Sequence, residues 1–118
     1  MAISDLLQRV KNGESVDFQE SIAVIDQAYR YQPTEFSNGL VEPLLNQAGQ
    51  NEGSCKIFAF AKLHGLNQTQ TLALFGDYYR QDVLGNPNGS NHLNIRRFMR
   101  DGWDGMVFSG VALQARAE

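Results

Sequence analysis

The chain has 118 residues, of which 42% are hydrophobic and 19% charged. This length suits one hydrophobic core, and this composition is apolar enough to fold, so two separate domains and a disordered chain are both excluded. The formal net charge of −3 excludes a globally basic surface for duplex nucleic acid, and the single cysteine excludes an internal disulfide.

Signals for a membrane or for secretion are not expected in this sequence. No apolar run approaches the length of a membrane span. In residues 1–10 the acidic Asp5 precedes the first basic residue, Arg9, whereas a secretory signal starts with a basic segment. We therefore expect a cytoplasmic protein that binds neither membranes nor nucleic acid.

Two short helices are expected at the N-terminal end. Residues Ser4 to Lys11 place apolar side chains at helical spacing behind a serine cap, and the Asn12-Gly13 pair ends this helix. A second helix is expected from Asp17 or Phe18 to about Ala28, because apolar residues again recur on successive turns.

A β-hairpin is expected next. Between Tyr29 and Phe36 the apolar period shortens to two, which predicts a strand, and Pro33 makes it an edge or bent strand. The Asn38-Gly39 pair is typical of a hairpin turn, since both residues tolerate positive φ. Residues Leu40 to Asn46 would then return as the second strand.

The remainder of the chain is predicted to be mostly helical. The apolar run from Glu52 to His64 contains alanines that favour a buried helix over a strand. A helix capped by Asn67 or Thr69 is expected to continue to about Leu84, with Leu72, Phe75, Tyr79 and Val83 in one stripe. After a turn at 85–90, Asn91 is expected to cap a helix that continues to about Asp101, and a short strand is expected within 103–108. The sequence thus predicts one α+β domain over residues 1–118, with about five helices and a small antiparallel sheet.

Cys55 is the candidate nucleophile. At the start of a helix, backbone amides lower the pKa of a thiol, and His64 or His92 would serve as its base. The alternative is a buried structural cysteine, because Phe58 and Ala59 continue the same helical face into the core. No local motif links either histidine to Cys55, which favours the structural interpretation.

Metal ions and cofactors are not predicted. The sequence has no Cys-x-x-Cys or His-Glu-x-x-His motif, and its two histidines are far apart. Phosphate-binding glycine loops and the Gly-x-Ser-x-Gly motif of serine hydrolases are also missing.

Three arginines share the outer face of the last expected helix. Arg96, Arg97 and Arg100 lie opposite its apolar residues, where an anion or an acidic partner could dock. Plain exposure to solvent is the favoured alternative.

The densest polar segment, residues 50–56, adjoins the apolar run. It could bind a polar ligand at a helix N-terminus through Glu52, Cys55 and Lys56. The favoured alternative is that Asn51 or Ser54 caps the helix. Glu52 and Lys56 are spaced for an i,i+4 ion pair.

Several segments together resemble the HopJ type III effector family over about residues 4–113. The likeness rests on residues Thr34 to Gly39, Ala48 to Ala61, Leu74 to Arg80, Asn86 to Gly89, Asn94 to Met99, and Gly102-Trp103.

The resemblance implies a small bacterial protein without an established enzymatic activity. It also implies that one group of residues lies close together: Asn51, Glu52, Ser54, Cys55, Lys56, Tyr79 and Arg80. We therefore expect a non-enzymatic binding or interaction module for a small molecule or a protein; no oligomeric state is indicated.

Two alternatives to the binding module are retained. One is a cysteine-dependent enzyme for acyl transfer or hydrolysis that uses Cys55 and His92. The other takes the family name literally and implies secretion through a type III system into a host cell. Helix signals from Ser4 onward favour a resident protein, because injected proteins usually begin with an unstructured segment.

Overall fold

The computed structural model describes residues 2–116, and the first two helices lie where the sequence predicts them. They are α1 (Ile3–Lys11) and α2 (Phe18–Ala28). The Glu20 carboxylate accepts a hydrogen bond from the Asp17 N–H at 3.1 Å and pairs with Arg9 at 3.0 Å, so it both caps α2 and joins it to α1. These contacts account for the start of α2 and for its packing beside α1.

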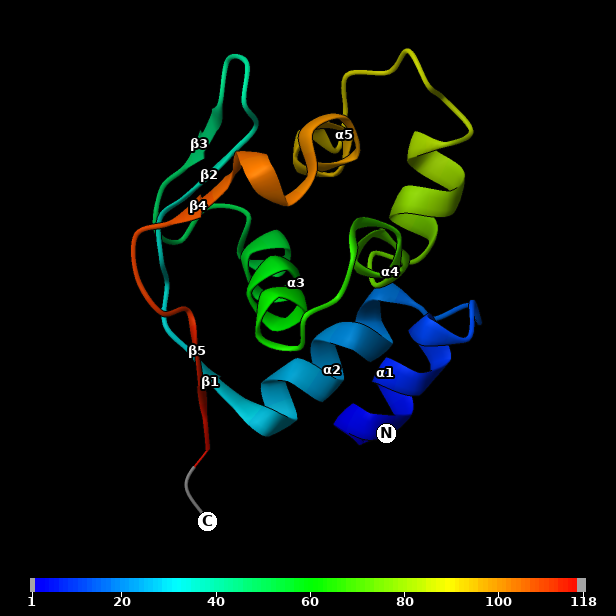
Figure 1. Cartoon of the computed structure of the whole chain (residues 1–118), viewed down its shortest axis with the longest axis vertical. Helices are drawn as coiled ribbons and strands as arrows, with labels where there is room; N and C mark the ends of the chain where they lie inside the picture. Colours follow the sequence, from blue (N-terminus) through cyan, green and yellow to red (C-terminus); the bar gives the residue numbers. More distant parts are fainter. Residues whose placement is uncertain (1, 117–118) are drawn as a thin grey trace.

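Helix α3 (Glu52–Leu63) is the predicted buried helix, confirmed to within one residue. Figure 1 shows it at the centre of the molecule, with α1, α2, α4 (Gln68–Ala73) and α5 (Leu93–Asp101) around it and the strands along one side. The ring of Phe58 lies within 6.0 Å of Phe36, 5.3 Å of Phe75 and 4.9 Å of Phe98, measured between centroids. This helix therefore organises the core.

The prediction of one continuous helix from residue 67 to about Leu84 is wrong, because the structure has two shorter elements there. Its first part is α4 (Gln68–Ala73), where the Asn67 side chain caps the Gln70 N–H at 2.8 Å. After a turn at Gly76, which has φ +62°, the chain continues as a π-helix, η1 (Tyr78–Val83). The break arises because backbone of the segment before α2 lies against Gly76, so a Cβ there would come within 2.6 Å of the Phe18 nitrogen. The predicted stripe still packs on the core across the break.

The last helix begins one residue later than predicted, because the residue that precedes it is His92 rather than the expected cap Asn91. Helix α5 (Leu93–Asp101) is followed by a 3-10 turn, η2 (Gly102–Gly105), and by strand β4 (Met106–Phe108). The strand expected within 103–108 is thus limited to its second half, because Trp103 belongs to the turn.

The predicted strand from Tyr29 to Phe36 divides into two strands of different sheets. Strand β1 (Tyr29–Tyr31) pairs antiparallel with β5 (Leu113–Ala115), a strand that the sequence did not predict. Strand β2 (Phe36–Asn38) begins after Pro33, whose missing N–H interrupts the pairing.

The predicted hairpin exists, but its turn is longer than expected. Strand β2 pairs with β3 (Leu44–Asn46) on one side and with β4 on the other. Asn38 is a fully buried strand residue rather than a turn residue, and the connection spans residues 39–43 with positive φ at Gly39 and Glu42. The prediction of positive φ is therefore confirmed for Gly39 and wrong for Asn38, and Glu42 takes the second positive φ of the connection.

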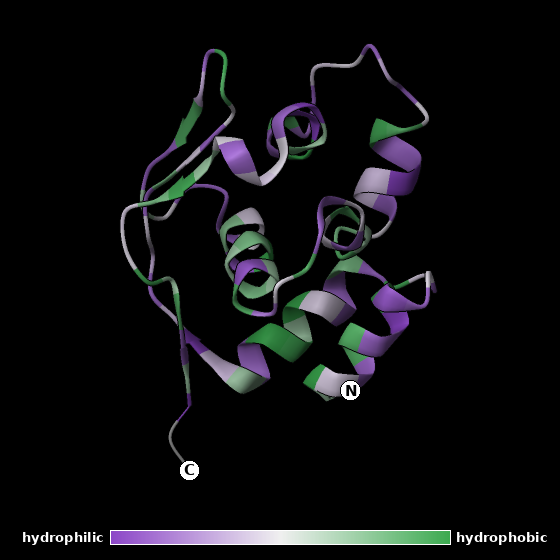
Figure 2. Ribbon diagram, in the orientation of Figure 1, coloured by the Kyte–Doolittle hydropathy of each residue, from purple (hydrophilic) through white to green (hydrophobic). Residues whose placement is uncertain are grey.

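The predicted α+β class and single domain are confirmed by this arrangement. Figure 2 shows apolar residues gathered on α2, α3, β3 and β4. Within residues 2–116, none of the helices combines the length and hydropathy needed to cross a membrane.

Candidate functional site

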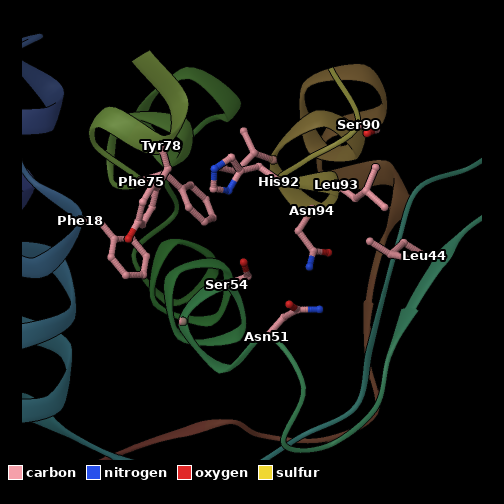
Figure 3. Close-up of a pocket in the computed structure, with 12 residues that line it drawn as sticks. Phe18, Leu44, Asn51, Ser54, Phe75, Tyr78, Ser90, His92, Leu93 and Asn94 are labelled. Carbon is pink, nitrogen blue, oxygen red and sulfur yellow. The ribbon is translucent and has the colours of Figure 1, made fainter. Parts of the chain in front are cut away.

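Helices α3 and α5 begin at the same cavity. Asn51 and His92 immediately precede them, with φ of 50° and 51°, a left-handed conformation that is uncommon outside glycine. Both residues line a cavity of about 590 Å³ (Figure 3). Two separate chain segments thus adopt the same unusual backbone conformation at one place.

The first turns of both helices expose backbone donors at this cavity. The first bonds inside the helices run from the Cys55 N–H to the Asn51 carbonyl and from the Arg96 N–H to the His92 carbonyl, at 3.0 and 3.1 Å. The N–H groups of the three residues before Cys55, and of the three before Arg96, have no acceptor within their own helix. The side chains of Asn51 and His92 do not cap them. Two partial positive charges therefore converge on the cavity.

An aromatic wall closes one side of the cavity. The ring centroid of Phe18 lies 5.0 Å from that of Tyr78 and 6.3 Å from that of Phe75. Phe18 packs so closely on α3 that a Cβ at Gly53 would come within 2.8 Å of its ring. Tyr78 projects from η1, and π-helical turns occur frequently at functional sites.

His92 is held in place from two sides. Its Nε2 atom is 3.1 Å from a carboxylate oxygen of Asp82, and its ring centroid is 5.1 Å from that of Tyr78. Figure 3 shows the imidazole between this aromatic wall and the start of α5, across the cavity from Ser54 and Asn51. The ring is thus positioned by contacts with η1.

A network of asparagine amides joins the two helix starts to the sheet. Asn46 and Asn94 exchange hydrogen bonds of 3.1 and 2.9 Å, and both are buried. Asn38 donates to the Asn94 carbonyl at 2.8 Å, and Asn51 donates to the Asn46 amide oxygen at 2.6 Å. The side chain of Asn51 therefore anchors α3 to β3 and does not cap the helix, contrary to the capping interpretation.

Sequence reasoning missed Asn38, Asn46 and Asn94 as parts of this site. A signal was present, because Asn46 follows two leucines and Asn94 lies between Leu93 and Ile95. A polar residue within an apolar stretch indicates a buried hydrogen-bond network when its face points to the core.

Cys55 lies outside the cavity. The side chain is fully buried, its Sγ is 3.7 Å from the Thr34 carbonyl oxygen, and burial raises the pKa of the thiol. His92 is engaged with Asp82 instead, so the structure does not bring Cys55 and His92 together.

Glu52 and Lys56 are also directed away from the cavity. Lys56 forms its ion pair with Asp26 at 2.8 Å rather than with Glu52, and its Nζ lies 5.0 Å from the Tyr31 ring centroid. The pKa of Tyr31 is raised, chiefly by burial and further by the nearby Cys55 and Glu52. This side of α3 faces β1.

Tyr79 and Arg80 hold η1 against the rest of the molecule. Arg80 donates to the Val16 carbonyl and to the Asp77 carboxylate, each at 3.0 Å, whereas Tyr79 is half-buried against the core. Of the residues proposed from sequence, the cavity brings together Asn51, Ser54 and His92 and leaves Glu52, Cys55, Lys56, Tyr79 and Arg80 elsewhere.

Metal ligation was not predicted, and residues 2–116 contain no group of three His, Cys, Asp or Glu side chains placed to hold a metal ion. The polar groups of the cavity are amide, hydroxyl, imidazole and backbone N–H groups. Such a set provides hydrogen bonds and partial positive charge.

The fold and the cavity together define a small α+β protein built around one buried helix. The chain belongs to the HopJ family, since the family described as "HopJ type III effector protein" matches residues 3–113, which confirms the resemblance. A solved structure, titled "Crystal structure of unknown function protein VPA0580", is 42% identical with a TM-score of 0.93, and the match covers 98% of this chain and 95% of that one. No match was found among curated proteins.

Proposed function

We propose that this protein is a non-enzymatic binding module whose cavity binds a small anionic molecule. The observation that carries the proposal is the convergence of the α3 and α5 N-termini on one cavity of about 590 Å³ beside an aromatic wall. Cavities of this size accommodate small organic ligands.

The polar half of the cavity suits a carboxylate or a phosphate group. Uncapped N–H groups of a helix N-terminus donate hydrogen bonds to anions, and the helix dipole adds a favourable potential. Ser54 lies in the first turn of α3 and adds a hydroxyl to these donors.

The other half suits a flat or apolar body. Phe18, Phe75 and Tyr78 line it, and the His92 ring lies beside Tyr78. A planar ring attached to the anionic group would stack on these side chains. The proposed ligand class is therefore an aromatic or partly apolar acid.

A binding role is favoured over the cysteine-dependent reaction because the two halves of the proposed dyad have other partners. Cys55 is buried against Thr34, and His92 contacts Asp82. A nucleophile must reach both its base and the substrate.

A charge placed inside the first turn of α3 tests the proposal. Ser54→Asp puts a carboxylate where the anion would sit, and an acidic residue in a first turn does not weaken a helix. Ser4→Asp is the matched control, since it makes the same change in the first turn of α1, away from the cavity.

Phenyl phosphate is the probe, with benzyl alcohol as its neutral counterpart, and backbone amide NMR shifts are the measurement. We expect saturable shifts at Gly53, Ser54 and Leu93 in the natural chain and the Ser4→Asp variant, and binding weaker by about tenfold in Ser54→Asp, equivalent to about 1.4 kcal/mol. Equal binding of benzyl alcohol, or unchanged binding by Ser54→Asp, would overturn the proposal.

A further inference from the structure

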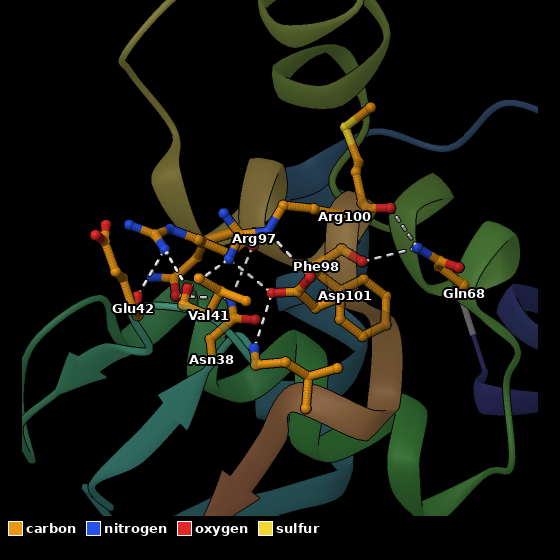
Figure 4. Close-up of polar contacts among 11 residues, drawn as sticks. Asn38, Val41, Glu42, Gln68, Arg97, Phe98, Arg100 and Asp101 are labelled. Atoms are coloured by element: carbon orange, nitrogen blue, oxygen red, sulfur yellow. Dashed lines mark hydrogen bonds and ion pairs between the residues drawn. The ribbon is translucent and has the colours of Figure 1, made fainter.

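The three arginines of α5 hold two loops rather than simply extending into solvent. Arg97 donates from Nη1 to the carbonyl oxygens of Val41 and Glu42, at 3.0 and 2.6 Å, and Arg100 donates to Val41 at 2.7 Å (Figure 4). Plain exposure therefore does not describe Arg97, which is half-buried, whereas Arg100 is exposed as expected although it holds the same loop.

Arg96 anchors the other loop, which connects η1 to α5. Its guanidinium donates to the carbonyl oxygens of Asn86 and Asn91 at 2.9 and 2.6 Å, and to the Asn91 side chain at 2.8 Å. These bonds order the arginine before any partner arrives, which reduces the entropy lost on binding.

The charges of Arg96 and Arg97 are not neutralised by these contacts, because their acceptors are carbonyl or amide oxygens. No ion pair among residues 2–116 includes either of them. Arg100, in contrast, pairs with Asp101 at 2.7 Å. A hydrogen bond from Arg100, joined by one from the Leu40 N–H, lowers the pKa of Asp101 to about 2, so this pair stays ionised at neutral pH.

Two further acidic side chains lie near this surface. Glu42 is exposed in the loop that Arg97 holds and lies within electrostatic range of Arg100. Asp82 is bonded to His92 on the cavity side. The unneutralised positive charge is therefore local to Arg96 and Arg97 in a chain whose net charge is −3.

A hollow of about 300 Å³ lies beside these charges. Arg96 and Arg100 line it together with an apolar set made up of Val83, Leu84, Pro87 and Met99. Leu84 is 49% exposed, although leucine is normally buried. The surface thus combines an apolar depression with ordered cations.

We propose that this surface, formed by Arg96, Arg97, Arg100 and the hollow at Leu84, binds an acidic segment of a partner protein. An apolar side chain of the segment would enter the hollow, and flanking carboxylates would contact the arginines. Arg97 forms its two bonds through Nη1, and Nε and Nη2 make no hydrogen bond or ion pair within residues 2–116, so they can bind a carboxylate in a bidentate manner.

A peptide segment fits these features better than a nucleic acid does. A polyanion would encounter the net negative charge of the whole chain, whereas a short segment responds mainly to charges within a Debye length of about 8–10 Å. The apolar hollow also requires an apolar group between the anionic ones, which acidic peptides provide.

The test measures fluorescence anisotropy with a pool of labelled acidic peptides, rich in Asp and Glu, that carry Leu, Phe or Met at their centre. A second pool replaces each acid by its amide. We expect the acidic pool alone to bind, and binding to weaken by about fivefold in Arg97→Gln and in Leu84→Ser, the loss expected for about 1 kcal/mol.

Matched controls come from outside the surface. Arg30→Gln and Leu63→Ser alter an exposed arginine on β1 and an exposed leucine on α3, and we expect both to leave binding unchanged. Leu84→Ser removes no hydrogen bond, so it tests the surface even if Arg97→Gln loosens its loop.

Three outcomes with the peptide pools and the variants would overturn the inference. They are the absence of binding by the acidic pool, equal binding of the amide pool, and equal weakening in the control variants. Preferential binding of phosphatidylserine vesicles or single-stranded DNA at Arg97 would also contradict it, because either would assign the surface to another class of partner.

Discussion

Asn46 on β3 and Asn94 at the start of α5 exchange two side-chain hydrogen bonds although 48 positions separate them in the sequence. Each amide both donates and accepts, and both residues are buried. Through Asn51 and Asn38 the same pair holds α3 and β2. The position of both helix starts at the cavity therefore depends on this reciprocal pair.

Replacing Asn94 by leucine should destabilise the fold strongly. The substitution removes three hydrogen bonds of the Asn94 side chain to the buried amides of Asn46 and Asn38, at a cost of about 1 kcal/mol each, while Asn38 keeps its bond to the Asn94 backbone carbonyl. We expect the free energy of unfolding to fall by about 3 kcal/mol, measured by urea denaturation. Asn88→Leu, at an exposed position, should change it by less than about 0.5 kcal/mol. A loss of similar size in both variants would contradict the role given to the network.

Gly76 and Gly65 provide a comparison of backbone strain with steric crowding. Both have left-handed φ, +62° and +65°, but only at Gly76 would a Cβ approach other atoms, the Phe18 nitrogen at 2.6 Å among them. Gly65→Ala should cost about 1 kcal/mol for the backbone conformation alone. Gly76→Ala should cost about 3 kcal/mol, because overpacking adds to the strain. Equal shifts of the thermal midpoint would show that the crowding at Gly76 is relieved.

His64 should make stability depend on pH. Burial, and secondarily the charge of Lys11, lowers the pKa of His64 below its usual 6.5, and its Nε2 is 2.8 Å from the Tyr29 hydroxyl. The unfolded chain then binds the proton more readily than the folded one. The contribution of neutral His64 to the free energy of unfolding is therefore present above pH 6.5 and is lost as the pH falls through the lowered pKa.

The variant His64→Gln tests this dependence, since glutamine keeps an acceptor for Tyr29 but does not titrate. We expect the urea midpoint to fall less steeply in the variant between pH ~7 and ~5, a range above the usual carboxylate pKa values. Parallel curves for the two proteins would show that His64 is not responsible.

Cys55 should be unreactive in the folded protein. The thiolate is the reactive form, and burial both raises the pKa of this thiol and blocks access to it. We expect iodoacetamide to modify the folded chain about 100-fold more slowly than the chain in guanidinium, followed by mass spectrometry. Modification at the denatured rate near neutral pH would restore the cysteine-dependent enzyme as an alternative.

Most helix positions and the core could be predicted from the sequence, apart from the break at Gly76. Helical spacing of apolar residues, together with Asn67 as a cap, predicted α1, α2, α3 and the start of α4 closely. These signals are local, because a helix forms its hydrogen bonds within one segment and buries one of its own faces. The family was likewise evident from short runs of residues.

The pairing of distant segments could not be predicted from the sequence, because it depends on tertiary contacts. The pairing of β1 with β5, the break at Gly76 and the asparagine network each depend on residues dozens of positions away. The same dependence selected Asn51, Ser54 and His92 for the cavity and excluded Cys55, because the direction of a side chain is set by the element packed against it. Spacing along one segment carries no information about that neighbour, so the polar run at 50–56 predicted a site without predicting which of its side chains face it.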